Sequence, residues 1–85
     1  MRYRNNKVAS MWSSSPFRNV MNHEKTLRFY SDGTIYSYRL LIGEIINGKH
    51  VVYDHTSKGG SFYSATTSRH VNLLKQYADR VIDYV

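Results

Sequence analysis

The sequence predicts an α+β domain: a three- to four-stranded antiparallel β-meander with a C-terminal helix packed on one face and a short N-terminal helix. Two observations indicate the sheet. Polar and apolar residues alternate through the middle of the chain, and Asp32-Gly33 and Asn47-Gly48 interrupt them as hairpin turns. An apolar stripe at helical spacing after Val71 indicates the C-terminal helix. The length of 85 residues suits a single domain, which we expect over residues 15–85.

Residues 1–14 are polar and basic and show no regular period, so we expect an irregular N-terminal arm. Trp12 is the exception, because a large aromatic side chain there is expected to dock on the core. Ser15-Pro16 is typical of a helix start, with serine as the N-cap and proline at the first helical position. This dipeptide predicts a short helix over residues 16–22.

The alternation predicts strands over residues 25–30, 34–46, 49–55 and 61–65. Two-residue turns at the two dipeptides would place Phe29 opposite Tyr36 and Val51 opposite Glu44. The core face of this register holds Leu27, Phe29, Tyr36, Tyr38, Leu40, Ile42, Val51 and Tyr53. The other face holds Arg28, Tyr30, Ile35, Ser37, Arg39, Leu41 and His50. Gly43 is a candidate site for a β-bulge.

A final helix is expected after Thr66-Thr67-Ser68, whose hydroxyl groups suit an N-cap. We expect it to lie across the apolar face of the sheet and to close the core. Its apolar stripe reaches the last residue and consists of Val71, Leu74, Ala78, Val81, Ile82 and Val85.

Positive charge is concentrated near the N-terminus. Residues 1–30 hold six Lys and Arg residues against one Glu, within a formal net charge of +6 for the chain. A basic segment suits an anionic partner, because neutralised phosphates release their condensed counterions. The alternative is that the excess charge only keeps a small protein in solution.

Motifs that carry chemistry are scarce, so we expect a protein that is not an enzyme and needs no metal or cofactor. The chain has no Cys, and its four His residues lie in different elements or on opposite strand faces. It also has no Gly-x-Ser-x-Gly motif and no phosphate-binding loop between a strand and a helix. Without an apolar run of about 18 residues or a leader, a cytoplasmic protein with no membrane contact is expected.

Two groups of residues are candidates for binding. At the start of the last helix, Ser68, Arg69 and His70 could contact a phosphate through the free N–H groups and the helix dipole; the alternative is an ordinary cap. On the outer sheet face, Tyr30 could stack on bases while Arg28 and Arg39 hold phosphates. A protein interface and an ordinary solvated face are the alternatives there.

Several short runs resemble a group of small bacteriophage proteins of unknown function: Ile35–Tyr38, Ile42-Gly43, Ser64–His70 and the Trp12-Ser13-Ser14 neighbourhood. The resemblance spans residues 12–75, and Thr-Thr-Ser-Arg-His is its distinctive run. It implies a phage or prophage origin and an accessory role in infection. A weaker resemblance, in α-β-β-β-α order, is to double-stranded RNA-binding domains, although the last helix lacks that family's lysine cluster.

Together these observations favour a non-enzymatic phage accessory protein that binds nucleic acid or a nucleoprotein complex in the host bacterial cytoplasm. The alternative is an inhibitor of a host defence system or host enzyme, such as RNA polymerase, that acts by protein–protein contact. A third possibility is an assembly protein that oligomerises through a strand edge. The expected binding residues are Arg2, Arg4, Lys7, Arg28, Tyr30, Arg39, Ser68, Arg69 and His70.

Overall fold

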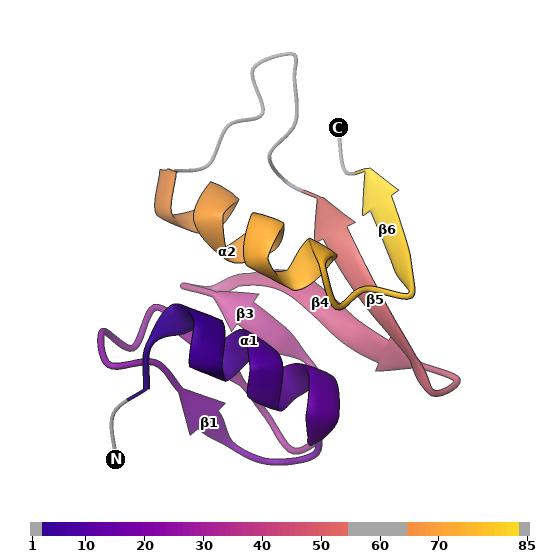
Figure 1. The fold of residues 1–85 in the computed structure, drawn as a ribbon, viewed down its shortest axis with the longest axis horizontal. Helices are drawn as coiled ribbons and strands as arrows, with labels where there is room; N and C mark the ends of the chain where they lie inside the picture. Colours follow the sequence, from indigo (N-terminus) through magenta and orange to yellow (C-terminus); the bar gives the residue numbers. More distant parts are fainter. Residues whose placement is uncertain (1–2, 55–64, 84–85) are drawn as a thin grey trace.

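The computed structural model describes residues 3–54 and 65–83 (Figure 1). In chain order its elements are α1 (Asn5–Ser14), β1 (Val20–Met21), β2 (Leu27–Phe29), β3 (Ile35–Ser37), β4 (Leu40–Ile46), β5 (Lys49–Asp54), α2 (Ala65–Lys75) and β6 (Arg80–Asp83). The strand expected over residues 61–65 lies outside the described residues, apart from Ala65, which begins α2. Within the described ranges, no helix is long and apolar enough to cross a membrane.

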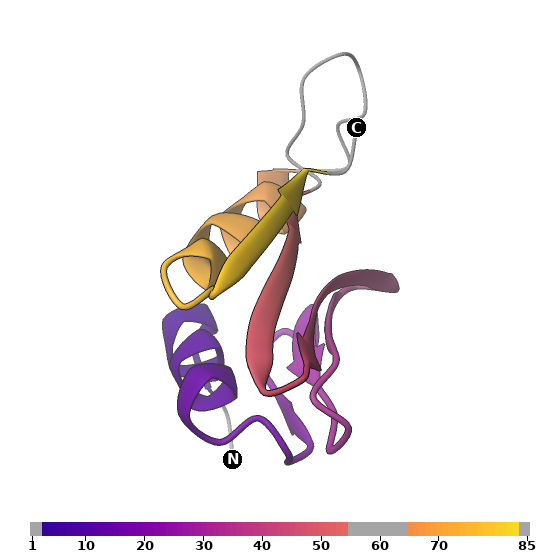
Figure 2. The same ribbon diagram turned by 90° about the vertical axis from the view of Figure 1, so that its right-hand side faces the viewer.

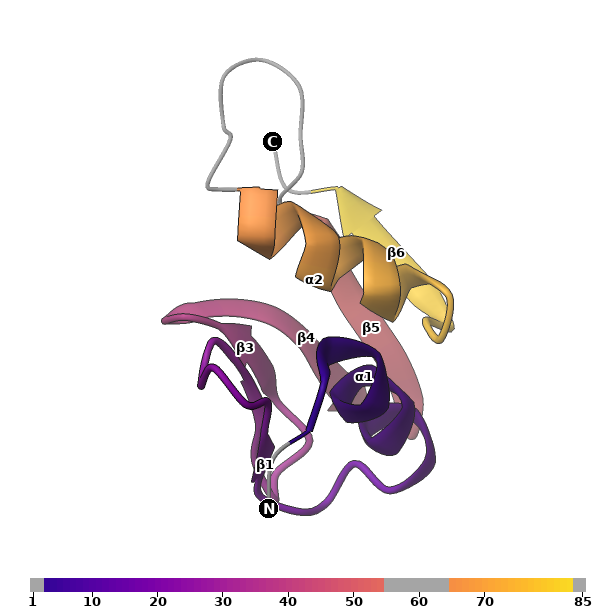
Figure 3. The ribbon, with the colours of Figure 1, turned by 60° about the vertical axis from the view of Figure 1, so that its left-hand side comes forward.

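The six strands form one sheet in the order β1-β2-β3-β4-β5-β6. Neighbours are antiparallel except β5 and β6, which are parallel because α2 carries the chain back between them. The helices contact each other on one face of the sheet, α1 against β2 and α2 against β5 (Figure 1 and Figure 3). The expected α+β class is confirmed, whereas the sheet has more strands than expected and is mixed rather than antiparallel.

The irregular arm expected over residues 1–14 is wrong for Asn5–Ser14, which form α1. Trp12 is fully buried, as expected, and its indole N–H donates to the carbonyl oxygen of Gly33 at 2.9 Å. The apolar stripe of α1 is only about two turns long in a polar segment, so it shows no clear period in the sequence. Its buried residues are Val8, Ala9 and Trp12.

The helix expected over residues 16–22 does not form, because this segment leads into β1. Val20 pairs with Phe29 of β2 and is buried, while Tyr3 forms a parallel bridge to Asn22 on the other side. A helix this short is marginal without strong tertiary contacts. Strand pairing on both sides therefore prevails over the helical spacing of its apolar residues.

The first hairpin has a three-residue loop in place of the two-residue turn expected at Asp32-Gly33. The N–H of Tyr30 donates to the carbonyl of Thr34 at 3.0 Å, and Gly33 has a φ of +90°, which favours glycine. As a result, Phe29 lies opposite Ile35 instead of Tyr36. A one-residue shift exchanges the two faces of a strand. This corrects the expected faces of Ile35, Tyr36, Ser37 and Tyr38, since Ile35 and Ser37 are the buried residues of β3.

The long strand expected over residues 34–46 is two strands joined by a tight turn at Tyr38-Arg39. Ser37 lies opposite Leu40 across this turn. Further along β4 the register shifts, because Tyr36 pairs with Leu41 while Ile35 pairs with Gly43. The extra residue is Ile42, so a bulge is present as expected, immediately before the paired Gly43.

The turn at Asn47-Gly48 forms as expected, with φ values of +51° and +77°, and Glu44 lies opposite Val51. Beyond the bulge, however, the faces are exchanged relative to the expectation. Val52 belongs to the core cluster, and His50 faces α1. The expected faces of Val51, Tyr53 and His50 are therefore wrong, although Val51 is buried as expected of a core residue, at 4% exposed.

The final helix expected to reach residue 85 ends at Lys75. The N–H of Tyr77 donates to the carbonyl of Leu74 at 2.9 Å, and the chain then continues into β6. The β-branched residues Val81 and Ile82 favour an extended strand, and they pair with β5. Over so few residues, helical spacing and strand pairing are not distinguished by hydrophobicity alone.

The core lies between the two helices and the sheet. Gly43 allows the close approach of α1, since a Cβ atom there would lie 3.2 Å from the Trp12 ring and 2.8 Å from Cγ2 of Ile35. The core cluster consists of Val8, Ala9, Trp12, Val20, Leu27, Phe29, Ile35, Ile42, Val52, Val71 and Leu74. The opposite face of the sheet carries neither of the two helices (Figure 2).

Candidate functional site

Five aromatic and basic side chains gather on the face of the sheet that neither helix covers. They line a shallow recess of about 300 Å³ and are Arg28, Tyr30, Tyr36, Tyr38 and Arg39. We call this group the tyrosine–arginine surface. Strand alternation places it there, because buried residues that face the helices flank Arg28 in β2 and Tyr36 in β3.

The tyrosine rings of this surface are partly fixed and partly open. Tyr30 and Tyr36 contact edge to face, with ring centroids 5.7 Å apart and planes at 73°. Such a contact contributes about 0.5–1.5 kcal/mol beyond burial. Tyr30 is nevertheless 39% exposed and Tyr38 is 46% exposed. The surface therefore offers two large aromatic side chains to a ligand, one of them braced by a third.

Arg28 lies among these rings with unused hydrogen-bonding capacity. Its Nη2 donates to the carbonyl oxygen of Tyr38 at 3.3 Å, but its Nε is shielded from solvent and has no partner among the described residues. An unmade hydrogen bond of a shielded polar group is costly. Neither Arg28 nor Arg39 has an ion pair with any carboxylate in the described ranges. Neither guanidinium charge is therefore neutralised by a carboxylate within those ranges.

The turn between β3 and β4 presents Tyr38 and Arg39 to solvent. Tyr38 has a φ of +57°, in the left-handed region that a residue with a Cβ atom seldom adopts. Its N–H donates to the carbonyl of Thr26 at 2.7 Å, and its own carbonyl accepts from Arg28. Both backbone polar groups of Tyr38 are thus satisfied by β2 and its flanking residue, which hold the turn against the tyrosine–arginine surface.

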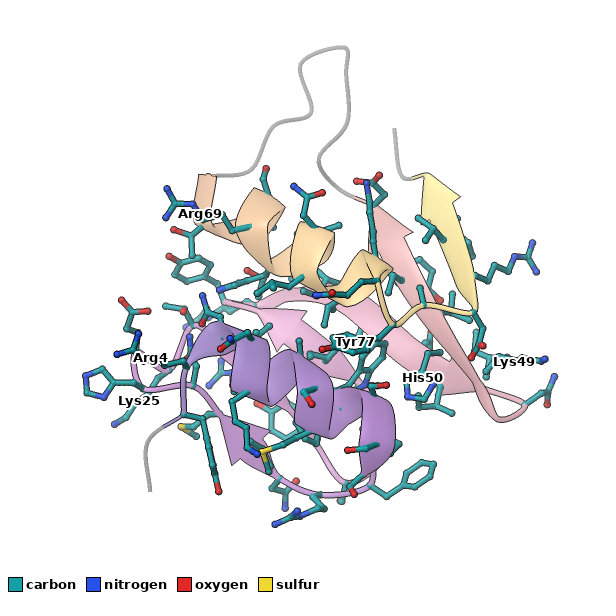
Figure 4. The ribbon with its side chains drawn as sticks, in the orientation of Figure 1. Arg4, Lys25, Lys49, His50, Arg69 and Tyr77 are labelled. Carbon is teal, nitrogen blue, oxygen red and sulfur yellow. The ribbon has the colours of Figure 1, made fainter. Side chains whose placement is uncertain are left out.

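The other basic residues expected to bind lie on the helix side. Arg4 precedes α1 and Lys7 lies within it, and both are exposed. Arg69 is exposed near the start of α2, and Figure 4 shows Arg4, Lys25 and Arg69 at one side of the helix layer. The structure therefore brings together Arg28, Tyr30 and Arg39 but places the helix-side cations on the opposite side of the sheet. Arg2 lies outside the described residues.

The phosphate contact expected at the start of the last helix is not assembled. His70 is 0% exposed, and its Nδ1 lies 2.7 Å from Oγ of Ser37, which is also 3.1 Å from Oγ1 of Thr67. The helix begins earlier than expected, at Ala65, and this turns Thr67 and His70 toward the core. Only Ser68, half-buried, and Arg69 keep access to solvent.

Burial also affects the titration of His70. Desolvation lowers the pKa of this imidazole below its usual 6.5, and the negative charge of Glu24 offsets the effect only in part. Nε2 of His70 is buried and has no hydrogen-bond partner in the part of the chain that the structure describes. His70 is therefore a buried core residue that connects α2 to β3, and it has no access to a ligand at the surface.

His50 has a structural role as well. Its Nε2 lies 3.0 Å from the carbonyl oxygen of Trp12, and the two rings contact edge to face with centroids 4.7 Å apart. Its backbone N–H donates to the Asp79 carboxylate at 2.8 Å, which lowers the pKa of that carboxyl group. No group of three or more potential metal ligands occurs among residues 3–54 and 65–83.

A second groove, of about 540 Å³, lies at the β4–β6 end of the molecule. Its lining includes the apolar residues Ile46, Val51 and Ile82 and the cations Lys49 and Arg80. Asn47 and Asp79 complete its lining. The sequence did not indicate this groove, because β6 was expected to be helical.

Sequence reasoning also missed Tyr36 and Tyr38 as members of the tyrosine–arginine surface, since the expected two-residue turn placed both in the core. Glycine as the third residue of a possible three-residue loop, Ser31-Asp32-Gly33, is the signal that could have found them. Comparisons of the chain with protein-family models, with curated proteins and with solved structures found no match.

Proposed function

We propose that this protein binds nucleic acid, alone or within a nucleoprotein complex, through the tyrosine–arginine surface. The observation that carries the proposal is the meeting of exposed tyrosine side chains with two arginines that have no ion pair within the described residues, on a sheet face that neither helix covers. Aromatic rings stack on bases, and guanidinium groups pair with phosphates. The formal net charge of +6 adds long-range attraction for a polyanion.

The proposed activity is binding without catalysis. Two features support it. The surface is a shallow recess, and the Ser37–His70 pair is fully buried, whereas the Ser–His pair of a hydrolase must be accessible to its substrate. In the setting implied by the resemblance to small phage proteins, this would be an accessory role in the cytoplasm of an infected bacterium.

A pair of double variants tests the site. Arg28→Ala with Arg39→Ala removes both guanidinium groups of the tyrosine–arginine surface, and Arg4→Ala with Lys7→Ala removes the same charge from the helix side. Fluorescence anisotropy with labelled DNA and RNA strands should show at least a tenfold loss for the first variant, because a hydrogen bond to a charged group contributes about 1.5–3 kcal/mol.

The helix-side variant is the matched control and should lose far less. Equal losses in both variants would mean that only total charge matters. Unchanged binding by the sheet-side variant would remove the tyrosine–arginine surface from the proposal.

One observation favours a second candidate function, inhibition of a host protein by direct contact. The lining of the groove at the β4–β6 end combines apolar side chains, among them Ile46 at 41% exposed, with the cations Lys49 and Arg80. An apolar patch with a polar rim is typical of protein interfaces. If this candidate is correct, a host protein captured from lysate stays bound after nuclease treatment, and Ile46→Asp abolishes the capture.

A further inference from the structure

We propose that the nucleic acid on the tyrosine–arginine surface is an unpaired single strand, with bases stacked on Tyr30 and Tyr38. This inference rests on the proposed function and adds the class of ligand. It depends on which part of a nucleic acid each side chain can reach.

To stack on a nucleic acid, the exposed tyrosine rings must reach the flat faces of its bases. In a duplex those faces are covered by neighbouring base pairs, and only base edges are open in the grooves. Tyr30 and Tyr38 keep 39% and 46% of their surface open, and Tyr36 braces Tyr30 from the side. Unpaired bases can reach such rings, so stacking is available to a single strand alone.

The charge of the surface is too small to hold a duplex by its phosphates. Of the residues that line the recess, two are cations, Arg28 and Arg39, which is few beside the roughly 6–10 phosphate contacts of a protein whose affinity depends strongly on phosphates. Stacking, by contrast, contributes roughly five- to 150-fold in affinity for each base. Most of the affinity must therefore come from bases.

The surface is also arranged before a ligand arrives. Hydrogen bonds from β2 and its flanking residue Thr26 hold the backbone of Tyr38 in its left-handed conformation. Nε of Arg28 lies beside this turn without a partner among residues 3–54 and 65–83. Because these groups are already positioned, binding a strand costs less ordering entropy.

Three probes of equal length test the inference with the full chain. They are a single strand of about 12 nucleotides, the same strand in a blunt duplex, and an abasic strand that keeps every phosphate. Anisotropy should show the single strand binding at least about tenfold more tightly than either of the others.

Two tyrosine variants connect this preference to the proposed rings. Tyr30→Leu and Tyr38→Leu should each weaken binding of the single strand about tenfold, while Tyr30→Phe, which keeps the ring, should bind nearly as the parent does. Circular dichroism of each variant verifies the fold. If the leucine variants lose as much affinity for the abasic strand as for the single strand, the rings do not act by stacking on bases.

The outcomes separate the inference from the function on which it rests. If the duplex or the abasic strand binds as tightly as the single strand, the inference is wrong and the proposed function stands. If none of the three probes binds even at low salt, the proposed function itself is wrong.

Discussion

Tyr38 is the residue at which backbone strain and exposure coincide. Its φ of +57° costs about 1–2 kcal/mol for a residue with a Cβ atom, and its side chain is 46% exposed, so burial compensates only in part. Strained residues persist where surrounding contacts hold them, and they concentrate at functional sites. The strain at Tyr38 is therefore consistent with a ring positioned for a ligand.

Tyr38→Asn should separate stability from binding. Asparagine tolerates the left-handed conformation, so the free energy of unfolding should rise by about 1 kcal/mol in urea denaturation. Loss of the ring should weaken single-strand binding about tenfold. A variant that is less stable than the parent would contradict the claim that the backbone of Tyr38 is strained. Undiminished affinity would show that the Tyr38 ring does not stack on a base.

His70 gives the fold a pH dependence whose sign follows from its burial. Because desolvation lowers its pKa in the folded state, the unfolded chain takes up this proton first as the pH falls. Stability is therefore full above the unfolded value of 6.5 and decreases below it. The pKa values of the Asp32 and Asp79 carboxyl groups are also lowered, so their contribution to stability is lost only at more acidic pH, as the pH falls below their ordinary value of 3.8.

Urea unfolding between pH 7.5 and 5 should show this decrease, with a slope of at most about 1.4 kcal/mol per pH unit for a single proton. His70→Gln should flatten the slope, whatever its effect on stability at pH 7.5. His23→Gln, at an exposed position, is the matched control and should retain the slope. An unchanged slope in the His70 variant would assign the pH dependence to other groups.

At the scale of elements, Trp12 is the side chain that connects α1 to both β4 and the first hairpin loop. Trp12 packs over Gly43 and donates a hydrogen bond to the carbonyl of Gly33 in the first hairpin loop. Nε2 of His50 also contacts the carbonyl oxygen of Trp12. These contacts connect α1 to the loop that sets the register of β2 and β3, and hence to the face on which Tyr36 lies.

Trp12→Phe tests this connection by keeping an aromatic ring and removing the indole N–H. The buried carbonyl of Gly33 then loses its partner, so the free energy of unfolding should fall by about 1–3 kcal/mol in chemical denaturation. Trp12→Ala should cost more, about 3–5 kcal/mol, because it also leaves a cavity. An unchanged stability of Trp12→Phe would indicate that the hydrogen bond contributes nothing, and equal losses in both variants would indicate that the packing of the ring contributes nothing.

The middle strands could be predicted from the sequence, but their faces could not. Alternation and turn dipeptides are local signals, so they identify a strand without information on the strands that pair with it. Asn47-Gly48 forms the expected turn. Which face is buried depends on whether the loop at Asp32-Gly33 has two or three residues, and hydrogen bonds to Thr34 decide that. α1 and β6 escaped prediction because each depends on tertiary contacts more than on its own periodicity.

For the whole molecule, the sheet separates two groups of positive charge. Arg28 and Arg39 lie on the open face, and Arg4, Lys7 and Arg69 lie on the helix side. The sequence indicated Arg28, Tyr30 and Arg39 as neighbours, because they lie close to one hairpin. It could not show that the helix-side cations are remote from them, since only the three-dimensional path of α1 and α2 sets that distance.

This separation predicts a shallow salt dependence of binding. A single strand releases about 0.7 counterions per phosphate contact, so contacts from Arg28 and Arg39 alone give a slope of log affinity against log salt near −1.4. If all five cations contacted one strand, the slope would be about −3.5. Anisotropy at several salt concentrations measures it. Arg4→Ala with Lys7→Ala should leave the slope unchanged, because those side chains lie on the other side of the sheet. A steep slope that becomes shallow in this variant would mean that the strand wraps around the molecule and uses both faces.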